Sequence, residues 1–358
     1  MVRFVFIFGS FIGTLFATQL PASEQALQQL LETKSCQKCD FSQADLRNLD
    51  LSGADLGGAR LDNAMLYNSD LSGARLEGAS LKGASFSRAN LQGASLQGLD
   101  LTRGRFSRAN LSGADLSGAN LSQANLEGAD LSAADLSGAT LDSASLLGSR
   151  LDGTRLAGSI LDRANLRGLD LSKAADLAKA SFKRADLRRT KLSGLELQGI
   201  DFTGARLLKA DLGGADLKHA IFINAELKKV VFVDADLRQA NFQGASMHGS
   251  RLTGAKLEGA VLQGLELGGN LIGVDFSQTR ISRVRFNGAN LKQANFRQAQ
   301  LEYVDLEGAN LYGADFDGAR LKRCNLRRAN LREARLEGVD LKGNILEGAM
   351  GLAASADH

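Results

Sequence analysis

An apolar residue recurs at every fifth position of this chain between Phe41 and Leu346, with two breaks in the spacing. The segment 114–116, Ala-Asp-Leu, shows the repeating unit: a small residue, a polar residue and a central leucine, followed by two polar or glycine positions. Every central residue except Met247 and Ile281 is Leu or Phe. A repeat this regular constrains the fold more strongly than composition does.

Neither a straight helix nor a flat strand can bury a five-residue pattern on one side. Five residues of an α-helix advance by about 500°, so successive leucines would scatter around its axis. Side chains in a strand alternate with period two, so leucines spaced by an odd number would point to opposite faces. The chain is therefore predicted to turn a corner once per unit, so that every central residue faces one common axis.

Phenylalanine indicates how many corners close one coil. An interval of 20 residues between rings corresponds to four units per coil, with rings stacked about 4.8 Å apart, one strand spacing. We therefore predict an all-β, four-sided parallel β-solenoid of about 15 coils, roughly 75 Å long at that spacing. The rings at this interval are Phe86 and Phe106, then Phe182, Phe202, Phe222 and Phe242, then Phe276, Phe296 and Phe316.

The unit resembles the A(D/N)LxX motif of the pentapeptide repeat family, and the resemblance covers residues 40–349. It implies a right-handed quadrilateral β-helix in which the central residue and the small residue two before it point inward. Ala44, Ala54, Ala114 and Ala309 fit the second role. Larger residues stand there in a few units and imply locally wider coils: Leu49, Leu99, Leu169 and Ile200.

Glycine often lies two residues after the central leucine, as at Gly53 and Gly118, where a corner benefits from its conformational freedom. Arg, Gln and Lys occupy the same position in other units. From this variety we predict that a positive φ is not obligatory at these corners.

The ends lie outside the repeat. Residues 1–22 combine Arg3, an apolar run from Phe4 to Ala17 and small residues after it, which predicts a secretory signal peptide; an uncleaved anchor is the alternative. Residues 23–39 hold a short helix that begins near Ser23 and covers the first coil. Residues 350–358 form a C-terminal tail. The predicted location is therefore exported: the periplasm, a thylakoid lumen or the extracellular medium.

Cys36 and Cys39 lie at the junction between the helix and the first coil. In an exported protein the simplest interpretation is a small structural disulfide. Free thiols and a redox or metal role remain alternatives, although the βαβ context of a redox CxxC and a second cysteine pair for zinc are missing from the sequence. Exported cyanobacterial members of the family look similar here, with a Thr-Lys-Ser-Cys segment before the first coil. Cys324 is expected to be an inert buried thiol.

Two irregularities interrupt the count. Leu171 and Leu177 are six residues apart, and Leu267 and Leu271 are four apart. We interpret them as a bulged and a tightened corner; a kink that shapes a partner surface is the alternative.

The sequence offers no recognisable catalytic machinery. Its three histidines, His219, His248 and His358, share no column, and no local motif gives a serine a base and an orienting acid. We expect no catalytic, cofactor-binding or metal-binding residues and no cofactor. The Asp and Asn residues before the leucines could bind cations, but corner hydrogen bonding is the simpler explanation.

Charge is the one distinctive surface signal. Residues 1–171 carry 15 Lys and Arg against 18 Asp and Glu, whereas residues 172–358 carry 28 against 22. Such clusters are often no more than a solvated face, but they can also bind anions. The candidate anion-binding residues are Arg188, Arg189, Lys209, Lys228 and Lys229, and then Arg320, Lys322, Arg323, Arg327, Arg328, Arg332 and Arg335.

Three functions are compatible with these features. The first is a non-catalytic exported scaffold that binds a protein partner and dimerises through its C-terminal coils, as several family members do. The second is a rod that binds a polyanion such as lipid, cell-wall polymer or nucleic acid. The third is a DNA mimic that inhibits a topoisomerase, a role the family resemblance suggests and the net basic charge of +3 disfavours. With three Tyr and no Trp, the chain lacks an outward stacking platform for single-stranded nucleic acid.

Overall fold

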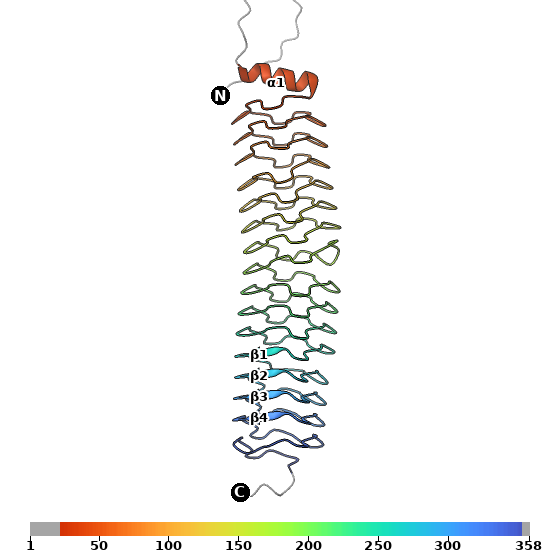
Figure 1. The fold of residues 1–358 in the computed structure, drawn as a ribbon, viewed down its shortest axis with the longest axis vertical. Helices are drawn as coiled ribbons and strands as arrows, with labels where there is room; N and C mark the ends of the chain where they lie inside the picture. The colour runs from red at the N-terminus through yellow and green to blue at the C-terminus, as the bar shows by residue number, and fades with distance from the viewer. Residues whose placement is uncertain (1–21, 353–358) are drawn as a thin grey trace, which may run out of the picture.

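The computed structural model describes residues 22–352, which form a rod of stacked coils with a helix across one end (Figure 1). The helix, α1, spans Ala22–Thr33 and lies on the first coil. The prediction of a four-sided solenoid with a short N-terminal helix is confirmed. The helix begins one residue before the position expected from the sequence.

Parallel bridges join each coil to the next, and the paired residues lie four repeat units apart in the chain. Asp50 pairs with Asp70, and Asn90 pairs with Asn110. Most pairings are single bridges, because the chain turns a corner after each unit. Four three-residue strands stack in parallel on one side near the C-terminal end: β1 (Val261–Gln263), β2 (Arg280–Ser282), β3 (Gln300–Glu302) and β4 (Arg320–Lys322).

The rod has four faces, which we name A to D in the order in which the chain visits them. The face that holds β1–β4 is face A. Each face has its own column of central residues. Face A includes Leu61, Phe202 and Leu262, and face B includes Leu66, Leu207 and Leu326. Face C includes Leu71, Leu212 and Leu291, and face D includes Leu76, Leu217 and Leu257.

The core is a column of central residues surrounded by the small residues that precede them by two. Leu116 and Ala114 are both almost fully buried, and this pattern continues along the rod. Bulky residues at the small position also face inward, as Leu99 and Ile200 do. Phenylalanines stack at the predicted interval, with ring centroids 4.8 Å apart for Phe296 and Phe316. The predicted phenylalanine columns are therefore confirmed as continuous stacks.

The prediction about the corners is wrong. Non-glycine residues two after the central leucine adopt the same left-handed conformation as glycine, with φ 58° at Arg88, 61° at Lys209 and 58° at Gln239 against 64° at Gly118. A side chain in this region costs roughly 1 kcal/mol or more relative to glycine. The stack imposes the corner: the Lys209 N–H donates to the carbonyl of Lys228 on the next coil at 3.1 Å.

The two irregularities are absorbed at single corners. Arg155 pairs with Asp176, so this coil holds one residue more than a regular coil. Lys256 pairs with Asp275, so this coil holds one residue fewer. Because the two shifts cancel, the regular pairing then resumes in its original phase.

The two ends of the rod differ. Leu30 of α1 is fully buried against the first coil. At the other end Leu336, Leu341 and Leu346 are only half-buried, although they occupy the central position that is buried elsewhere. Within residues 22–352 no element covers this last coil.

Candidate functional site

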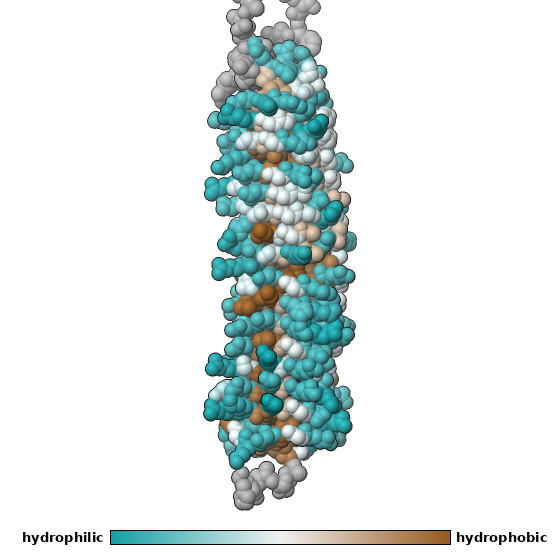
Figure 2. Space-filling model, in the orientation of Figure 1, coloured by the Kyte–Doolittle hydropathy of each residue, from teal (hydrophilic) through white to brown (hydrophobic). Residues whose placement is uncertain are grey.

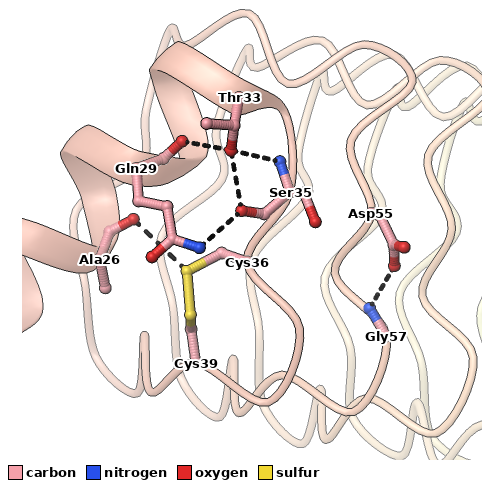
Figure 3. Close-up of a disulfide and its surroundings, with 8 residues drawn as sticks. All are labelled: Ala26, Gln29, Thr33, Ser35, Cys36, Cys39, Asp55 and Gly57. Atoms are coloured by element: carbon pink, nitrogen blue, oxygen red, sulfur yellow. Dashed lines mark hydrogen bonds between the residues drawn. A yellow bond between two sulfur atoms is a disulfide. The ribbon is translucent and has the colours of Figure 1, made fainter.

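The helix and the first coil meet around a disulfide (Figure 3). Cys36 and Cys39 are joined by an S–S bond of 1.97 Å, and the Sγ of Cys36 lies 3.5 Å from the carbonyl oxygen of Ala26 in α1. The side-chain amide of Gln29 donates to the carbonyl of Ser35 at 3.1 Å. Because these contacts link helix and coil directly, this region is a structural junction.

The Asp and Asn columns close the corners with hydrogen bonds. Oδ1 of Asp50 accepts from the N–H of Ser52 at 3.0 Å. The amide of Asn90 donates to Oδ1 of Asp70 on the preceding coil at 3.0 Å, and Asn110 donates to Asn90 at 2.9 Å. These three oxygens are thus already engaged, which favours the hydrogen-bonding interpretation over cation binding at these corners.

The described histidines do not come together. His219 is exposed on a corner of face D, whereas His248 lies beside face B with its Nδ1 3.8 Å from a carboxylate oxygen of Glu266. His358 lies outside the described residues. Across residues 22–352 no group of His, Cys, Asp or Glu is arranged to hold a metal ion. The remaining thiol, Cys324, is buried, and burial raises its pKa, so it is a poor nucleophile.

The two basic clusters predicted from the sequence have different surroundings. In the first, Arg189, Lys209 and Lys229 form a column on successive coils at the corner after face B, with Arg188 and Lys228 beside it. Arg188 is bound by Asp186. Among the described residues no carboxylate lies within 4.0 Å of the other four cations, which therefore remain free.

The second cluster is partly neutralised. Lys322 pairs with Glu302 at 3.0 Å, Arg327 with Glu347 at 2.6 Å, and Arg335 more loosely with Asp315 at 3.8 Å. Arg323 stacks over the ring of Tyr303. Arg320, Arg328 and Arg332 have no carboxylate within 4.0 Å in the described chain.

Face A carries a surface that the sequence analysis missed. Hydrophobic residues gather in a stripe along the face on which β1–β4 lie (Figure 2). On three consecutive coils the outward residues are uncharged, and two of the coils contribute Ile or Val. The uncharged strip, as we call it, consists of Ile221, Ile223, Asn241, Gln243, Val261 and Gln263.

The same face bears a further exposed apolar side chain nearer the N-terminal end, Ile160, which is 42% exposed. It belongs to the column of Ile221 and Val261, three and five coils away. The signal was present in the sequence: β-branched residues stand immediately before and after central residues, where most units have polar ones. The five-residue pattern is defined by the buried positions, so it does not reveal these outward-facing residues.

Shallow hollows lie at the two irregular corners. One, of about 240 Å³, is lined by Ala174, Ala175 and Leu195 among others. The other, of about 270 Å³, lies over Gly268 and Gly269 and is bordered by Glu266 and Arg285, which pair at 3.1 Å. His248 also lines the second hollow, beside Glu266.

The repeat model of the family described as "Pentapeptide repeats (8 copies)" matches this chain in overlapping segments over residues 39–264 and 269–343. The chain belongs to the pentapeptide repeat family. Its coil is accordingly the right-handed quadrilateral β-helix of that family, whose members are generally non-catalytic structural or interaction proteins.

Several solved structures are similar to this pentapeptide repeat protein. HetL of the cyanobacterium Nostoc sp. strain PCC 7120, involved in regulation of heterocyst differentiation, is 32% identical over 66% of this chain and 95% of its own, with a TM-score of 0.28. A pentapeptide repeat protein of the Arabidopsis thaliana thylakoid lumen is 33% identical over 31% and 67%, with a TM-score of 0.20. The plasmid-mediated fluoroquinolone resistance protein QnrB1 is 17% identical over 71% and 90%, with a TM-score of 0.24. No curated protein matches the chain significantly.

The helical content of the described chain is limited to α1. With 12 residues, α1 is too short to cross a membrane, and residues 22–352 contain no other helix that could do so.

Proposed function

We propose that this protein is a non-catalytic, exported scaffold that binds a protein partner through side chains on the faces of the rod. The observation that carries the proposal is the uncharged strip on face A. Protein interfaces are depleted of charge at their centre, and Ile and Val there supply apolar contact area. The strip lies between Asp201 on the coil before it and Arg280 on the coil after it, so charged residues border it at both ends.

A photo-crosslinking residue tests this surface directly. Placed at Gln243, which is exposed in the strip, it should capture a discrete protein from the native envelope fraction. The matched control is Gln97, an exposed glutamine at the equivalent position of face D. The captured partner should then bind the purified chain, and Ile223→Lys should weaken that binding at least tenfold. Equal capture from both positions, or turnover of a substrate by the purified protein, would contradict the proposal.

The half-buried last coil supports a second contact, with another copy of the chain. Leu336, Leu341 and Leu346 leave apolar surface and unpaired backbone groups at the C-terminal end of the described rod. Two copies that meet end to end would cover both surfaces. Light scattering at micromolar concentration should give the mass of a dimer, and Leu341→Glu should give a monomer. A monomeric wild-type chain would rule out this contact.

Export and the signal peptide are part of the same proposal. The apolar run and the small residues that follow it carry this inference, and the run lies outside the described residues. Fractionation of cells that express a C-terminally tagged chain should place the protein beyond the inner membrane, shortened at its N-terminus. A full-length chain in the cytoplasmic fraction would oppose export without affecting the proposed surface.

A further inference from the structure

We propose that the corner after face B docks the rod lengthwise onto an anionic phospholipid surface. The residues concerned, which we call the basic edge, are Arg167, Arg189, Lys209, Lys228 and Lys229. This inference is independent of the protein-binding strip, because the two lie on different faces.

The basic edge keeps its full charge because the nearby acids are used elsewhere. Asp186 is bound by Arg188 and also lies 3.9 Å from Arg206, and Glu226 lies 3.4 Å from Arg206. Within residues 22–352 none of the five cations of the basic edge has a carboxylate within 4.0 Å, and all five are exposed. The edge thus presents five unneutralised positive charges over four coils.

Three of these cations occupy corner positions at which glycine would have a lower conformational energy. Arg189, Lys209 and Lys229 have φ of 61°, 61° and 57°, the left-handed conformation that favours glycine. In the same column the three coils before them and the coils directly after them have glycine, whereas Arg88, Arg108 and Arg328 occupy it nearer the two ends. These glycines are Gly128, Gly148, Gly168, Gly249, Gly288 and Gly308. Since the fold accepts glycine at this corner, the corner itself does not require these three consecutive cations.

The shape of the basic edge is better suited to a flat membrane surface than to a linear polyanion. Its cations follow a straight convex corner, which touches a flat surface along its whole length but offers a linear polymer no groove. Leu208 is half-buried next to Lys209, and Leu147, 43% exposed, occupies the same column three coils earlier. Cations interspersed with leucine are typical of segments that lie at an anionic membrane interface. The edge contains no aromatic side chain on which bases would stack.

Vesicle sedimentation tests the proposal with the full-length chain. Vesicles made of two parts phosphatidylcholine to one part phosphatidylglycerol should bind it at low salt, whereas pure phosphatidylcholine vesicles should bind it much less. Each cation near an anionic leaflet contributes about fivefold in affinity, so the triple variant Arg189→Gln, Lys209→Gln, Lys229→Gln should bind about 100-fold more weakly. Binding to the anionic vesicles should also fall steeply when salt is raised to about 0.5 M.

Matched variants keep the result specific. Glutamine adopts the same corner conformation at Gln239, so the triple variant is expected to fold, which circular dichroism checks. The control changes Lys179, Arg280 and Arg320, three exposed cations at or beside the opposite corner of the rod, to Gln and should alter binding by less than threefold. The apolar N-terminal run is common to all variants, so their differences isolate the basic edge.

Three outcomes would overturn the proposal. The first is equal binding to both kinds of vesicle. The second is undiminished binding by the folded triple variant. The third is tight, salt-sensitive binding of duplex DNA or a polyphosphate, lost in the triple variant, without vesicle binding; this would assign the edge to a polymeric anion. Each outcome leaves the protein-crosslinking result at Gln243 unaffected.

Discussion

The guanidinium of Arg238 donates hydrogen bonds to both carboxylate oxygens of Asp236, two residues earlier in the chain. Nη2 lies 2.6 Å from Oδ2, and Nε lies 2.8 Å from Oδ1. Lys218 on the preceding coil lies 3.5 Å from the same carboxylate. This arrangement joins an Asp column of face D to a column of cations beside it.

The first prediction concerns the titration of this carboxylate. The hydrogen bonds from Arg238, opposed by partial burial, lower the pKa of Asp236 to about 2. Because the folded pKa is below the unfolded value of about 3.9, the pair stabilises the fold above pH 4, and this contribution is lost as pH falls towards 2. Arg238→Gln should raise the pKa of Asp236, as followed by carboxyl NMR. Arg88→Gln, far along the rod, should not; an unchanged Asp236 in the first variant would refute this account.

A second prediction concerns the phenylalanine stack. The ring of Phe222 lies 5.1 Å from that of Phe202 and 4.9 Å from that of Phe242, with Phe232 edge-on at 5.8 Å. Phe222→Ala should lower the free energy of unfolding by about 3–5 kcal/mol. Phe222→Leu restores the commonest central residue and should cost only about 1–2 kcal/mol, the value of two ring pairs.

Guanidinium unfolding measures both Phe222 variants. Phe232→Leu serves as the control, because Phe232 makes edge contacts but does not belong to the stack. It should cost less than Phe222→Leu. If the two leucine variants were equally destabilised, face-to-face stacking would not be the source of the effect.

The left-handed corners give a third prediction, in which two opposite substitutions change the free energy of unfolding in opposite directions. At Gly118 a Cβ would meet nothing within 4 Å, so Gly118→Ala isolates the backbone and should destabilise by about 1 kcal/mol. Ala133 already has φ 56°, and Ala133→Gly should be neutral or stabilising. Thermal unfolding of the two variants checks this. A stabilising Gly118→Ala would show that the solution corner lacks the left-handed conformation.

The disulfide at the junction leads to a fourth prediction, which is local. Replacing Cys36 and Cys39 by Ser should loosen the contact between α1 and the first coil, while the distant coils, which contact only their neighbours, keep their stability. Hydrogen exchange should rise around residues 22–40 and remain unchanged beyond about residue 80. Cys324→Ala, at the other end, should leave exchange at α1 unaffected. Uniformly faster exchange along the rod would contradict a local role.

The sequence predicted the coil because one physical requirement, burial of the central residue, repeats in every unit. Phe222 could be assigned to a stack from spacing alone, since its neighbours one coil away face the same axis. The corner conformation was mispredicted because Lys209 has little intrinsic preference for positive φ. Hydrogen bonds between coils outweigh that preference.

The candidate surfaces were less predictable than the core. Arg188 and Arg189 are identical neighbours in sequence, yet Arg188 turns back onto Asp186 and Arg189 projects from the corner. Only three-dimensional placement distinguishes a neutralised cation from a free one. The uncharged strip combines residues from successive coils, and no local motif marks it.

The extra residue near Ala175 shifts the numbering of every column by one, and the missing residue near Gly268 cancels that shift. Between them every column is displaced by one in numbering, and beyond them the original frame returns: Leu171 and Leu271 lie on the same face, five coils and 100 residues apart. The rod is therefore modular in length: a gain or loss of four whole units lengthens or shortens it by one coil without rotating its faces. A gain or loss of one to three whole units turns the surfaces downstream by part of a turn, whereas a change of a single residue is absorbed at one corner, as at Ala175 and Gly268. The distance between two binding surfaces along the rod can therefore change in steps of about 4.8 Å, one coil at a time, while the two surfaces keep their relative orientation.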